Sequence, residues 1–185
     1  VVVTVTQFDC LAVHPGVPAR SVTELIALAK AKPEEIRYGS GGNGSVGHFA
    51  AELFRSLANI KLAHVPYKGT GPAANAAIAG EIHMLIANIA SLLPQARAGR
   101  LRALAVTGAR RARIVPDLPT IAEAGVPGYE FENWYGIWAP AGTPAAVVNK
   151  INAEVNRALV TPALQERFAE AGIETAGGTA EKFAA

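Results

Sequence analysis

The stretch that decides the fold is Tyr38-Gly39-Ser40-Gly41-Gly42-Asn43-Gly44-Ser45-Val46-Gly47-His48, which joins a short apolar segment to an amphipathic helix. The four glycines between Gly39 and Gly44 lack the Cβ atoms that restrict φ and block close approach. A ligand can therefore meet bare backbone N–H groups here. The helix that follows directs its unpaired N–H donors and the positive end of its dipole to the same place. This arrangement favours an anion, and the pattern does not choose between a carboxylate and a phosphate.

Around this stretch, strand-like and helix-like segments alternate with short connections, which is typical of a mostly parallel sheet covered by helices. A capping box at Ser21 and Glu24 begins one helix, and Pro33 ends it. The further expected strands are 36–38, 61–65, 82–86 and 101–107, and the further expected helices are 46–57, 72–79 and 91–98. Because parallel strands place their carboxyl ends along one edge, the loops that follow these strands are predicted to lie together.

The two ends of the chain have a different texture. Residues 1–6 and 10–13 are extended, and a short helix is expected at 121–124, followed by a strand at 131–138. Thr143-Pro144 and Thr161-Pro162 each predict a helix with threonine as the N-cap and proline at the first helical position. We place a lobe boundary near Leu118. The chain opens inside a strand without Met and closes where a helix begins, so we expect a piece of a longer protein.

Composition excludes several classes of function. The chain has 185 residues, half of them hydrophobic, which allows one ordinary domain or two small lobes with a sizeable core. A net charge of +2 is too small to indicate a nucleic-acid partner, and the one dense basic cluster, residues 110–113, carries no aromatic residue. A single cysteine excludes an internal disulfide, and no apolar run reaches the ~18 residues of a membrane span.

Two motifs of other protein classes are approximated in the glycine-rich stretch. Residues 42–47 match the dinucleotide pattern G-x-G-x-x-G, but the next strand ends without the acid that would hold a ribose. Residues 43–47 nearly match the nucleophile elbow G-x-S-x-G, but Asn43 replaces its first glycine. Ser45 is therefore interpreted as a hydroxyl donor to a ligand or as a helix N-cap. His48 is either within reach of a bound anion or a structural, partly buried histidine.

Two further loops follow strands at the same predicted edge. In the first, Tyr67 is placed to line a cleft and the N–H groups of residues 69–71 to donate to a ligand, with a plain turn as the competing interpretation. In the second, Asn88 offers a donor and an acceptor, and Ser91 is a candidate helix cap. We find no metal-ligand spacing and no paired acid and base, so no metal, cofactor or catalytic residue is predicted. The acids, Glu52 among them, are interpreted as solvated.

Six stretches together resemble the Bug-type periplasmic solute-binding receptors of tripartite tricarboxylate transporter systems. They occur in the order of that family and cover nearly the whole chain. The stretches are 21–32 (SVTELIALAKAK), 38–48 (YGSGGNGSVGH), 65–69 (VPYKG), 99–107 (GRLRALAVT), 117–128 (DLPTIAEAGVPG) and 134–144 (WYGIWAPAGTP).

The resemblance implies an α/β, periplasmic-binding-protein-like (type II) three-layer sandwich with one lobe essentially complete and the other truncated. It divides the chain into a crossover strand and hinge (1–20), the second, anion-binding lobe (21–118) and a returning segment of the truncated first lobe (119–185). The protein would be a periplasmic Venus-flytrap receptor and not an enzyme, with its signal peptide and N-terminal lobe outside this sequence. It would capture a small carboxylate (a di- or tricarboxylate, an amino acid or an aromatic acid) for membrane permease subunits. The ligand-binding residues so implied are Ser40, Gly41, Gly42, Asn43, Gly44, Ser45, His48, Tyr67, Lys68, Gly69, Thr70 and Asn88.

Departures from the family and alternatives complete the expectations. Family members often carry aspartates where Asn75, His83 and Ala87 stand here, and loss of an acid near Ala87 would alter preference for ammonium groups. We expect self-association through apolar residues in 1–6 and 131–138. The alternatives are an effector-binding lobe of a regulator and, less favoured, a hydrolase that uses Ser45.

Overall fold

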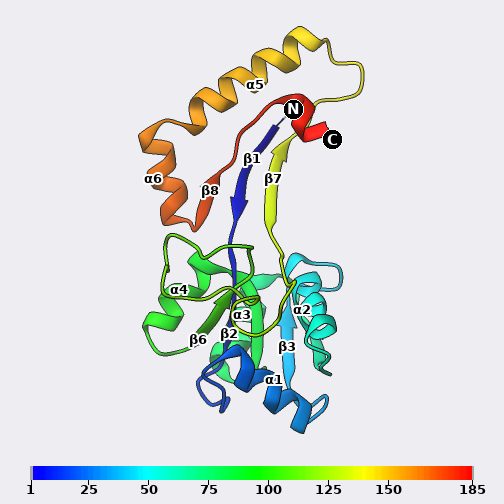
Figure 1. Ribbon diagram of the computed structural model, residues 1–185, viewed down its shortest axis with the longest axis vertical. Coiled ribbons are helices and arrows are strands. Elements are labelled where there is room, and N and C mark those ends of the chain that lie inside the picture. Colours follow the sequence, from blue (N-terminus) through cyan, green and yellow to red (C-terminus); the bar gives the residue numbers. More distant parts are fainter. Residues whose placement is uncertain (1, 185) are drawn as a thin grey trace. The chain divides into compact units, whose positions relative to one another are not determined.

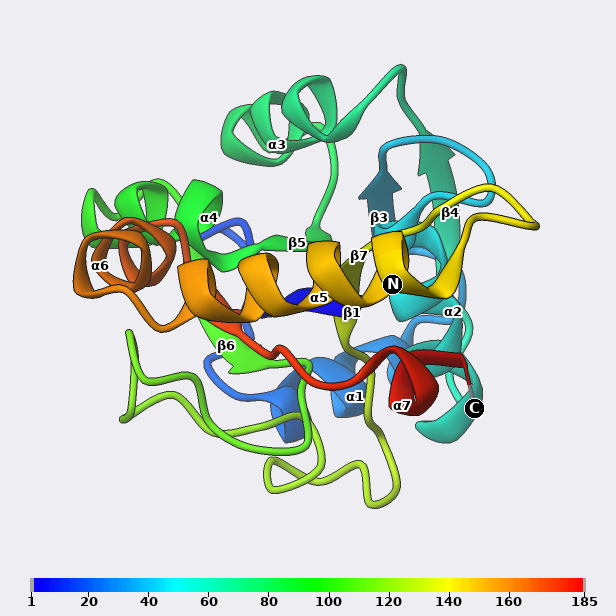
Figure 2. The same cartoon turned by 90° about the horizontal axis from the view of Figure 1, so that it is seen from above.

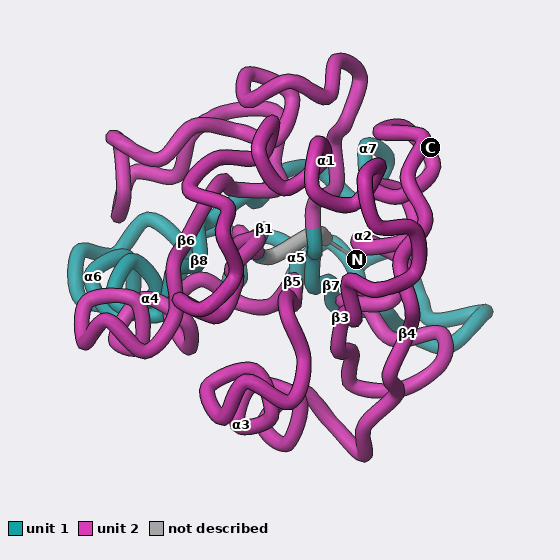
Figure 3. Tube along the Cα trace, turned by 90° about the horizontal axis from the view of Figure 1, so that it is seen from below, with its two compact units in different colours: residues 1–7, 133–185 teal, residues 8–132 magenta. Residues whose placement is uncertain are grey.

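The structure is a computed structural model that describes residues 2–184, and it divides into two compact units (Figures 1 and 3). Unit 1 combines the segment up to Gln7 with the segment from Asn133 onward, and unit 2 is Phe8–Glu132. The boundary expected near Leu118 therefore lies further along the chain, after Glu132. Each unit is described below by itself.

Unit 2 is built on a five-stranded sheet in the order β4-β3-β5-β2-β6. The strands are β2 (Asp9–Val13), β3 (Arg37–Ser40), β4 (Ala63–Pro66), β5 (Met84–Asn88) and β6 (Arg102–Val106). Strand β3 pairs in parallel with β4 and β5, whereas β2 runs antiparallel to both of its neighbours, β5 and β6. The predicted mostly parallel sheet is thus confirmed, with one antiparallel strand inserted before the last.

Helices cover both faces of this sheet, as Figure 2 shows. Helices α1 (Val22–Ala31) and α2 (Val46–Leu57) pack on one face, and α3 (Thr70–Ala79) and α4 (Ile89–Arg97) on the other. Successive side chains of a strand point to opposite faces of the sheet, so each face has its own hydrophobic core. In β2, Leu11 and Val13 belong to one core, and Cys10 and Ala12 belong to the other. The three-layer α/β sandwich is therefore as predicted.

Local signals in the sequence explain where several helices begin and end. Ser21 Oγ accepts a hydrogen bond from the Glu24 amide at 3.1 Å, as the predicted capping box requires, while the Glu24 carboxylate bonds the Arg20 amide at 2.6 Å. Gly80 stops α3 in the left-handed region with φ of 77°. Helix α2 has the predicted bounds, whereas α4 begins at Ile89, two positions before the predicted Ser91.

Two segments assigned elsewhere by the sequence belong to unit 2. Strand β2, which was expected in a hinge at 1–20, is an inner strand of the sheet. Residues 119–132, which were expected in the returning segment 119–185, fold onto the sheet because the Ile121 amide donates to the Val106 carbonyl at 2.9 Å. The buried Tyr129 hydroxyl also donates to the Ala50 carbonyl at 3.0 Å. The helix expected at 121–124 is a turn.

Unit 1 contains a three-stranded sheet in the order β7-β1-β8, in which both outer strands are antiparallel to β1. Its elements are β1 (Val2–Gln7), β7 (Asn133–Ile137), α5 (Ala145–Leu159), α6 (Pro162–Glu170), β8 (Ile173–Thr175) and α7 (Ala180–Ala184). Thr161 is the N-cap residue of α6 with Pro162 first in the helix, as predicted. Helix α5 starts one residue later than expected, because Pro144 is its N-cap and the Thr143 hydroxyl donates instead to the Pro140 carbonyl at 2.8 Å.

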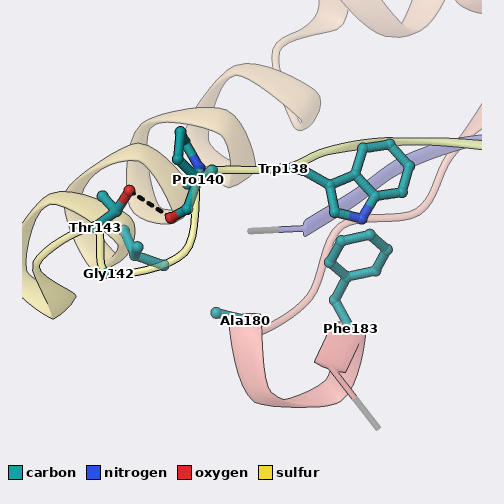
Figure 4. A pocket seen from close by; sticks show the side chains of 8 residues that line it. Trp138, Pro140, Gly142, Thr143, Ala180 and Phe183 are labelled. Carbon is teal, nitrogen blue, oxygen red and sulfur yellow. Dashed lines mark hydrogen bonds between the residues drawn. The ribbon is translucent and has the colours of Figure 1, made fainter.

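Aromatic rings gather at one end of unit 1. The rings of Trp134, Trp138 and Phe183 lie with centroids 5.3–5.9 Å apart, and Trp138 keeps 65% of its surface exposed. Figure 4 shows Trp138 and Phe183 facing each other beside the turn at residues 140–143. The predicted self-association through 131–138 stays a prediction, and the side chains of residues 1–4 lie outside the described part.

Across residues 2–184, no helix combines the length and the apolar character that a membrane crossing requires.

The second residue of α2 and of α3 is a glycine, and the two positions are expected to respond oppositely to alanine. A Cβ at Gly47 would lie 2.6 Å from the Ile86 carbonyl oxygen, a backbone atom, whereas a Cβ at Gly71 meets nothing within 4 Å. We expect Gly47→Ala to lower the free energy of unfolding by about 1–3 kcal/mol through overpacking. Gly71→Ala should leave it unchanged or raise it by up to about 1 kcal/mol. Urea unfolding measures both, and equal stability of the two variants would contradict the packing argument.

Candidate anion-binding site

The three loops singled out in the sequence gather at one edge of the five-stranded sheet. Strands β3, β4 and β5 run in parallel and end at Ser40, Pro66 and Asn88, so their carboxyl ends share that edge. The first two loops are tied directly. The Tyr67 amide donates to the Ser40 carbonyl at 3.0 Å, and the Gly69 amide donates to the Gly41 carbonyl at 3.1 Å.

The glycines of the first loop serve this contact between loops. A Cβ on Gly41 would lie 3.2 Å from the Thr70 amide nitrogen, and one on Gly42 would lie 3.3 Å from the Tyr67 carbonyl oxygen. Gly44 differs, because it adopts φ of 75° with open space around its Cα. At 41 and 42 the absence of a side chain admits the neighbouring loop, and at 44 it permits a left-handed backbone.

Several amides of the glycine tract already have partners within the loop, contrary to the expectation of bare donors. The Gly42 amide donates to Ser40 Oγ at 3.1 Å, and the Gly44 amide donates to His48 Nδ1 at 3.1 Å. The Ser45 amide donates to the Gly42 carbonyl at 3.2 Å. These three N–H groups hold the loop in shape. The donors left for a ligand therefore lie in the helix turns that follow.

The first turns of α2 and α3 supply those donors. Neither Ser45, which precedes α2, nor Gly69, which precedes α3, makes a side-chain capping hydrogen bond. First-turn N–H groups have no acceptor inside their own helix, and both turns open at the same sheet edge. The positive ends of two helix dipoles thus converge there without an internal anion or cap. The N–H groups concerned belong to Val46, Gly47 and His48 in α2 and to Thr70 and Gly71 in α3.

Helix α4 is arranged differently. Asn88 Oδ1 accepts hydrogen bonds from the amides of Ala90 at 2.7 Å and Ser91 at 3.2 Å. Ser91 is consequently not the cap, and its hydroxyl donates to the Asn88 carbonyl at 2.8 Å. The side-chain oxygen of Asn88, which was predicted to accept from a ligand, is therefore used to cap α4. Only the side-chain NH₂ group of Asn88 remains as a donor to a ligand.

The two serines predicted as ligand contacts have different environments. Ser40 is buried, and its hydroxyl bonds the Gly42 carbonyl at 3.1 Å and His64 Nε2 at 2.6 Å. Ser45 Oγ is covered and has no hydrogen-bond partner in the described part of the chain. An unsatisfied buried hydroxyl costs about 1–3 kcal/mol. Ser45 is therefore the serine whose hydroxyl would gain from a ligand, whereas Ser40 shapes the loop.

The remaining predicted residues differ in exposure. Lys68 is the one cation among the twelve predicted contacts, and its side chain is exposed. Gly41, Gly42, His48, Tyr67, Gly69 and Asn88 are half-buried, and Asn43, Gly44 and Thr70 are exposed. Apart from the buried Ser40, the predicted set thus lies at or near the surface of unit 2.

Residues outside the predicted ligand contacts support the first loop. Tyr38 and His64 are paired across β3 and β4, and their rings stack with centroids 4.7 Å apart. His64 also stacks on His48, at 4.3 Å. The Tyr38 hydroxyl donates to Glu52 at 2.6 Å, and Arg55 Nε donates to the same carboxylate at 3.0 Å. The interpretation of Glu52 as a solvated acid is therefore wrong.

This cluster has perturbed ionisation. Burial lowers the pKa of His64, and the neighbouring His48 lowers it further. Burial acts to raise the pKa of Glu52, but the hydrogen bonds from Tyr38 and Arg55 outweigh it and hold that pKa below its usual value. Burial, followed by the hydrogen bond to Glu52, raises the pKa of Tyr38. The cluster is thus most stable with a neutral His64 and an ionised Glu52.

The geometry gives no support to nucleophilic catalysis by Ser45. A nucleophile needs a base within hydrogen-bond reach, and His48 Nδ1 is bonded to the Gly44 amide while Ser45 Oγ has no partner among the described residues. Within residues 2–184, no group of three or more His, Cys, Asp or Glu side chains is arranged to hold a metal ion. The hollow beside Trp138 in unit 1 is lined without a charged side chain.

Removal of the α4 cap provides a test of the hydrogen bonds at this edge. Asn88→Ala should lower the free energy of unfolding by about 1 kcal/mol, because the Ala90 and Ser91 amides lose their acceptor. Asn88→Asp keeps a side-chain oxygen at the cap and should retain most of that stability. Chemical denaturation of both variants decides the point, and an alanine variant as stable as the wild type would show that the cap is not formed.

The amino-acid sequence is similar to those of known receptor proteins. The family model described as "Tripartite tricarboxylate transporter family receptor" matches residues 1–185. A protein from the tcbD–tcbE intergenic region of Pseudomonas sp. is 40% identical over the whole chain, which covers 55% of that relative. The protein BugT of Bordetella pertussis is 35% identical over 88% of the chain and 50% of the relative. The chain therefore spans about half the length of the curated relatives it matches.

Solved structures agree with these relatives. An R. palustris protein, Rpa4515, solved with adipate, superposes with a TM-score of 0.90 at 38% identity, covering all of this chain and 62% of that one. MatC from Rhodopseudomonas palustris, solved with bound malate, gives a TM-score of 0.81 at 30% identity, covering 94% of this chain and 59% of the other. The periplasmic binding protein BugD also superposes, with a TM-score of 0.81 at 30% identity, and a TctC solute binding protein from Polaromonas gives a TM-score of 0.82 at 26% identity. These neighbours agree with the predicted class of solute-binding receptor rather than enzyme. The chain belongs to the Bug-type receptor family of tripartite tricarboxylate transporters.

Proposed function

We propose that this chain forms the anion-binding part of an extracytoplasmic receptor that captures a small carboxylate. The observation that carries the proposal is the pair of uncapped helix starts, α2 and α3, at one sheet edge where the third helix, α4, is capped by Asn88. A carboxylate with its two oxygens fits two converging sets of neutral N–H donors. The adipate and malate in the related structures are both small carboxylates.

The ligand would be held mainly by neutral groups. The α2 and α3 amides and the Ser45 hydroxyl carry no net charge, and Lys68 is the cation nearest in sequence to these donors. Neutral donors bind an anion without a fixed counter-charge that would slow its release, which suits a receptor that must deliver its ligand. This favours the receptor over the hydrolase and the regulator lobe that the sequence left open.

The proposal extends to the architecture and setting of the whole protein. Unit 2 would be one lobe of a two-lobed receptor, and unit 1 would contribute to the other lobe. The receptor would act in the periplasm and deliver its carboxylate to the membrane permease subunits of a tripartite tricarboxylate transporter. The family supports this role, since its members are receptors of such transporters.

Calorimetry of the complete gene product against adipate and malate tests the proposed ligand class. We expect a saturable signal with at least one of these acids and none with the diamide of adipic acid, which lacks the charge. The double variant Gly44→Val, Ser45→Ala should weaken binding by at least about 30-fold, because a β-branched residue at positive φ costs on the order of 2 kcal/mol and displaces the loop.

Gly99→Val is the matched control for this double variant. Gly99 has φ of 69° and the same open space as Gly44, but it follows the far end of α4, away from the loop edge. It should cost similar stability and leave binding unchanged. Undiminished carboxylate affinity in the Gly44→Val, Ser45→Ala variant would refute the site. If Gly99→Val weakened binding to the same degree, the loss of affinity in the double variant would reflect general destabilisation of the protein and not the site.

A further inference from the structure

Two histidines, His48 from the predicted site and His64 from outside it, support amides of the glycine loop, His48 directly and His64 through Ser40. His48 Nδ1 accepts the Gly44 amide at 3.1 Å. His64 Nε2 lies 2.6 Å from Ser40 Oγ, and that oxygen accepts the Gly42 amide at 3.1 Å. The two rings stack on each other with centroids 4.3 Å apart and an interplanar angle of 19°. The shape of the loop therefore depends on the protonation of a histidine pair.

The hydrogen bond to Gly44 fixes the state of His48. A ring nitrogen can accept an N–H only when it carries no proton, so the ring in this structure is the neutral form with its proton on Nε2. Protonation would turn Nδ1 into a donor facing another donor. The Gly44 amide would then be released, and a positive charge would stand beside the first turn of α2.

While no anion is bound, an imidazolium at His48 would have positive neighbours. The helix start places positive dipole ends next to His48, and two imidazolium rings at 4.3 Å would repel each other. The groups that face the pair are the Tyr38 ring, from β3, and Glu52 on α2, whose carboxylate is already engaged by Tyr38 and Arg55. Burial keeps the pKa of His64 low, so His48 is the ring that would receive a proton.

We propose that His48 takes up a proton when a carboxylate binds at the glycine loop, and that His64 is a positioning residue that holds the loop through Ser40. The inference rests on the proposed function. One carboxylate anion and one proton from solvent bind together. An N–H bond forms at His48 Nδ1 while an O–H bond of hydronium breaks and leaves water, and the Gly44 amide and the His48 imidazolium become two further donors to the anion. Carboxylate affinity should accordingly rise as the pH falls.

Calorimetry with adipate, and with malate in parallel, measures the proton directly. Titrations at one pH in buffers of different ionisation enthalpy should give a net uptake of up to about one proton in the wild type. The affinity should fall by up to about tenfold for each unit by which the pH rises, the limit for one linked proton. His48→Gln keeps an acceptor for Gly44 but does not titrate, so it should bind with no uptake and a flat pH profile.

Variants of two other histidines distinguish proton uptake by His48 from positioning of the loop by His64. His83→Gln changes a ring that accepts the Arg37 amide at 2.9 Å, at the opposite end of β3 from Ser40, and it should keep the wild-type pH profile. His64→Gln should weaken adipate binding at every pH while uptake by His48 persists. A His64→Gln variant with wild-type affinity would show that His64 does not position the loop.

Amide NMR of the protein without any ligand gives an independent readout. The Gly44 amide resonance should shift with the same midpoint as the His48 imidazole and should stop titrating in His48→Gln. A Gly44 amide that ignores the His48 titration, or adipate affinity that is independent of pH in the wild type, overturns the inference and leaves the proposed function standing. Absence of any adipate or malate binding overturns the proposed function and the proton uptake with it.

Discussion

Close backbone approach at the carboxyl edge of the five-stranded sheet is the constraint on which the rest of unit 2 depends. The α2 helix can begin where it does only because Gly47 lets its backbone approach the Ile86 carbonyl, and the first two loops can touch only because Gly41 lacks a Cβ. These approaches bring the starts of α2 and α3 to one place. Since a helix start is open to an anion only if nothing else caps it, glycine packing and the proposed anion capture would be two consequences of the same geometry.

The hydrogen bonds at this edge divide into those that build the loop and those left for a ligand. The side chains of Ser40, His48 and Asn88 accept hydrogen bonds from backbone amides of the protein itself. These bonds fix the glycine loop and cap the start of α4. The first turns of α2 and α3 receive no such side chain. A buried donor without an acceptor is costly, so a protein retains such groups where a ligand or solvent satisfies them. In unit 2, Ser21 and Asn88 thus close the starts of α1 and α4, whereas the starts of α2 and α3 stay open to solvent or to the proposed ligand.

Much of this organisation was predictable from the sequence, because the signals are local. Alternating strands and helices, the Ser21 capping box and the 46–57 helix are read from neighbouring residues, and the structure has them. The features that the sequence did not predict depend on which strands pair and on their register. The return of residues 119–132 to the sheet, the place of β2 between β5 and β6, and the contact of His64 with Ser40 follow from strands meeting across long sequence separations. No periodicity within one segment carries that information.

The same distinction explains why the glycine tract predicted that the loops would meet but not which groups its amides would bond. Glycine in a sequence signals close approach, but not whether the approaching group is a ligand or another loop. Here Gly41 and Gly42 face the loop that begins at Tyr67, and the amides of Gly42 and Gly44 are bonded to side chains. The tract thus acts as a scaffold for the helix start. Because one of those side chains is a histidine, the proposed capture of a carboxylate would couple the scaffold to a proton.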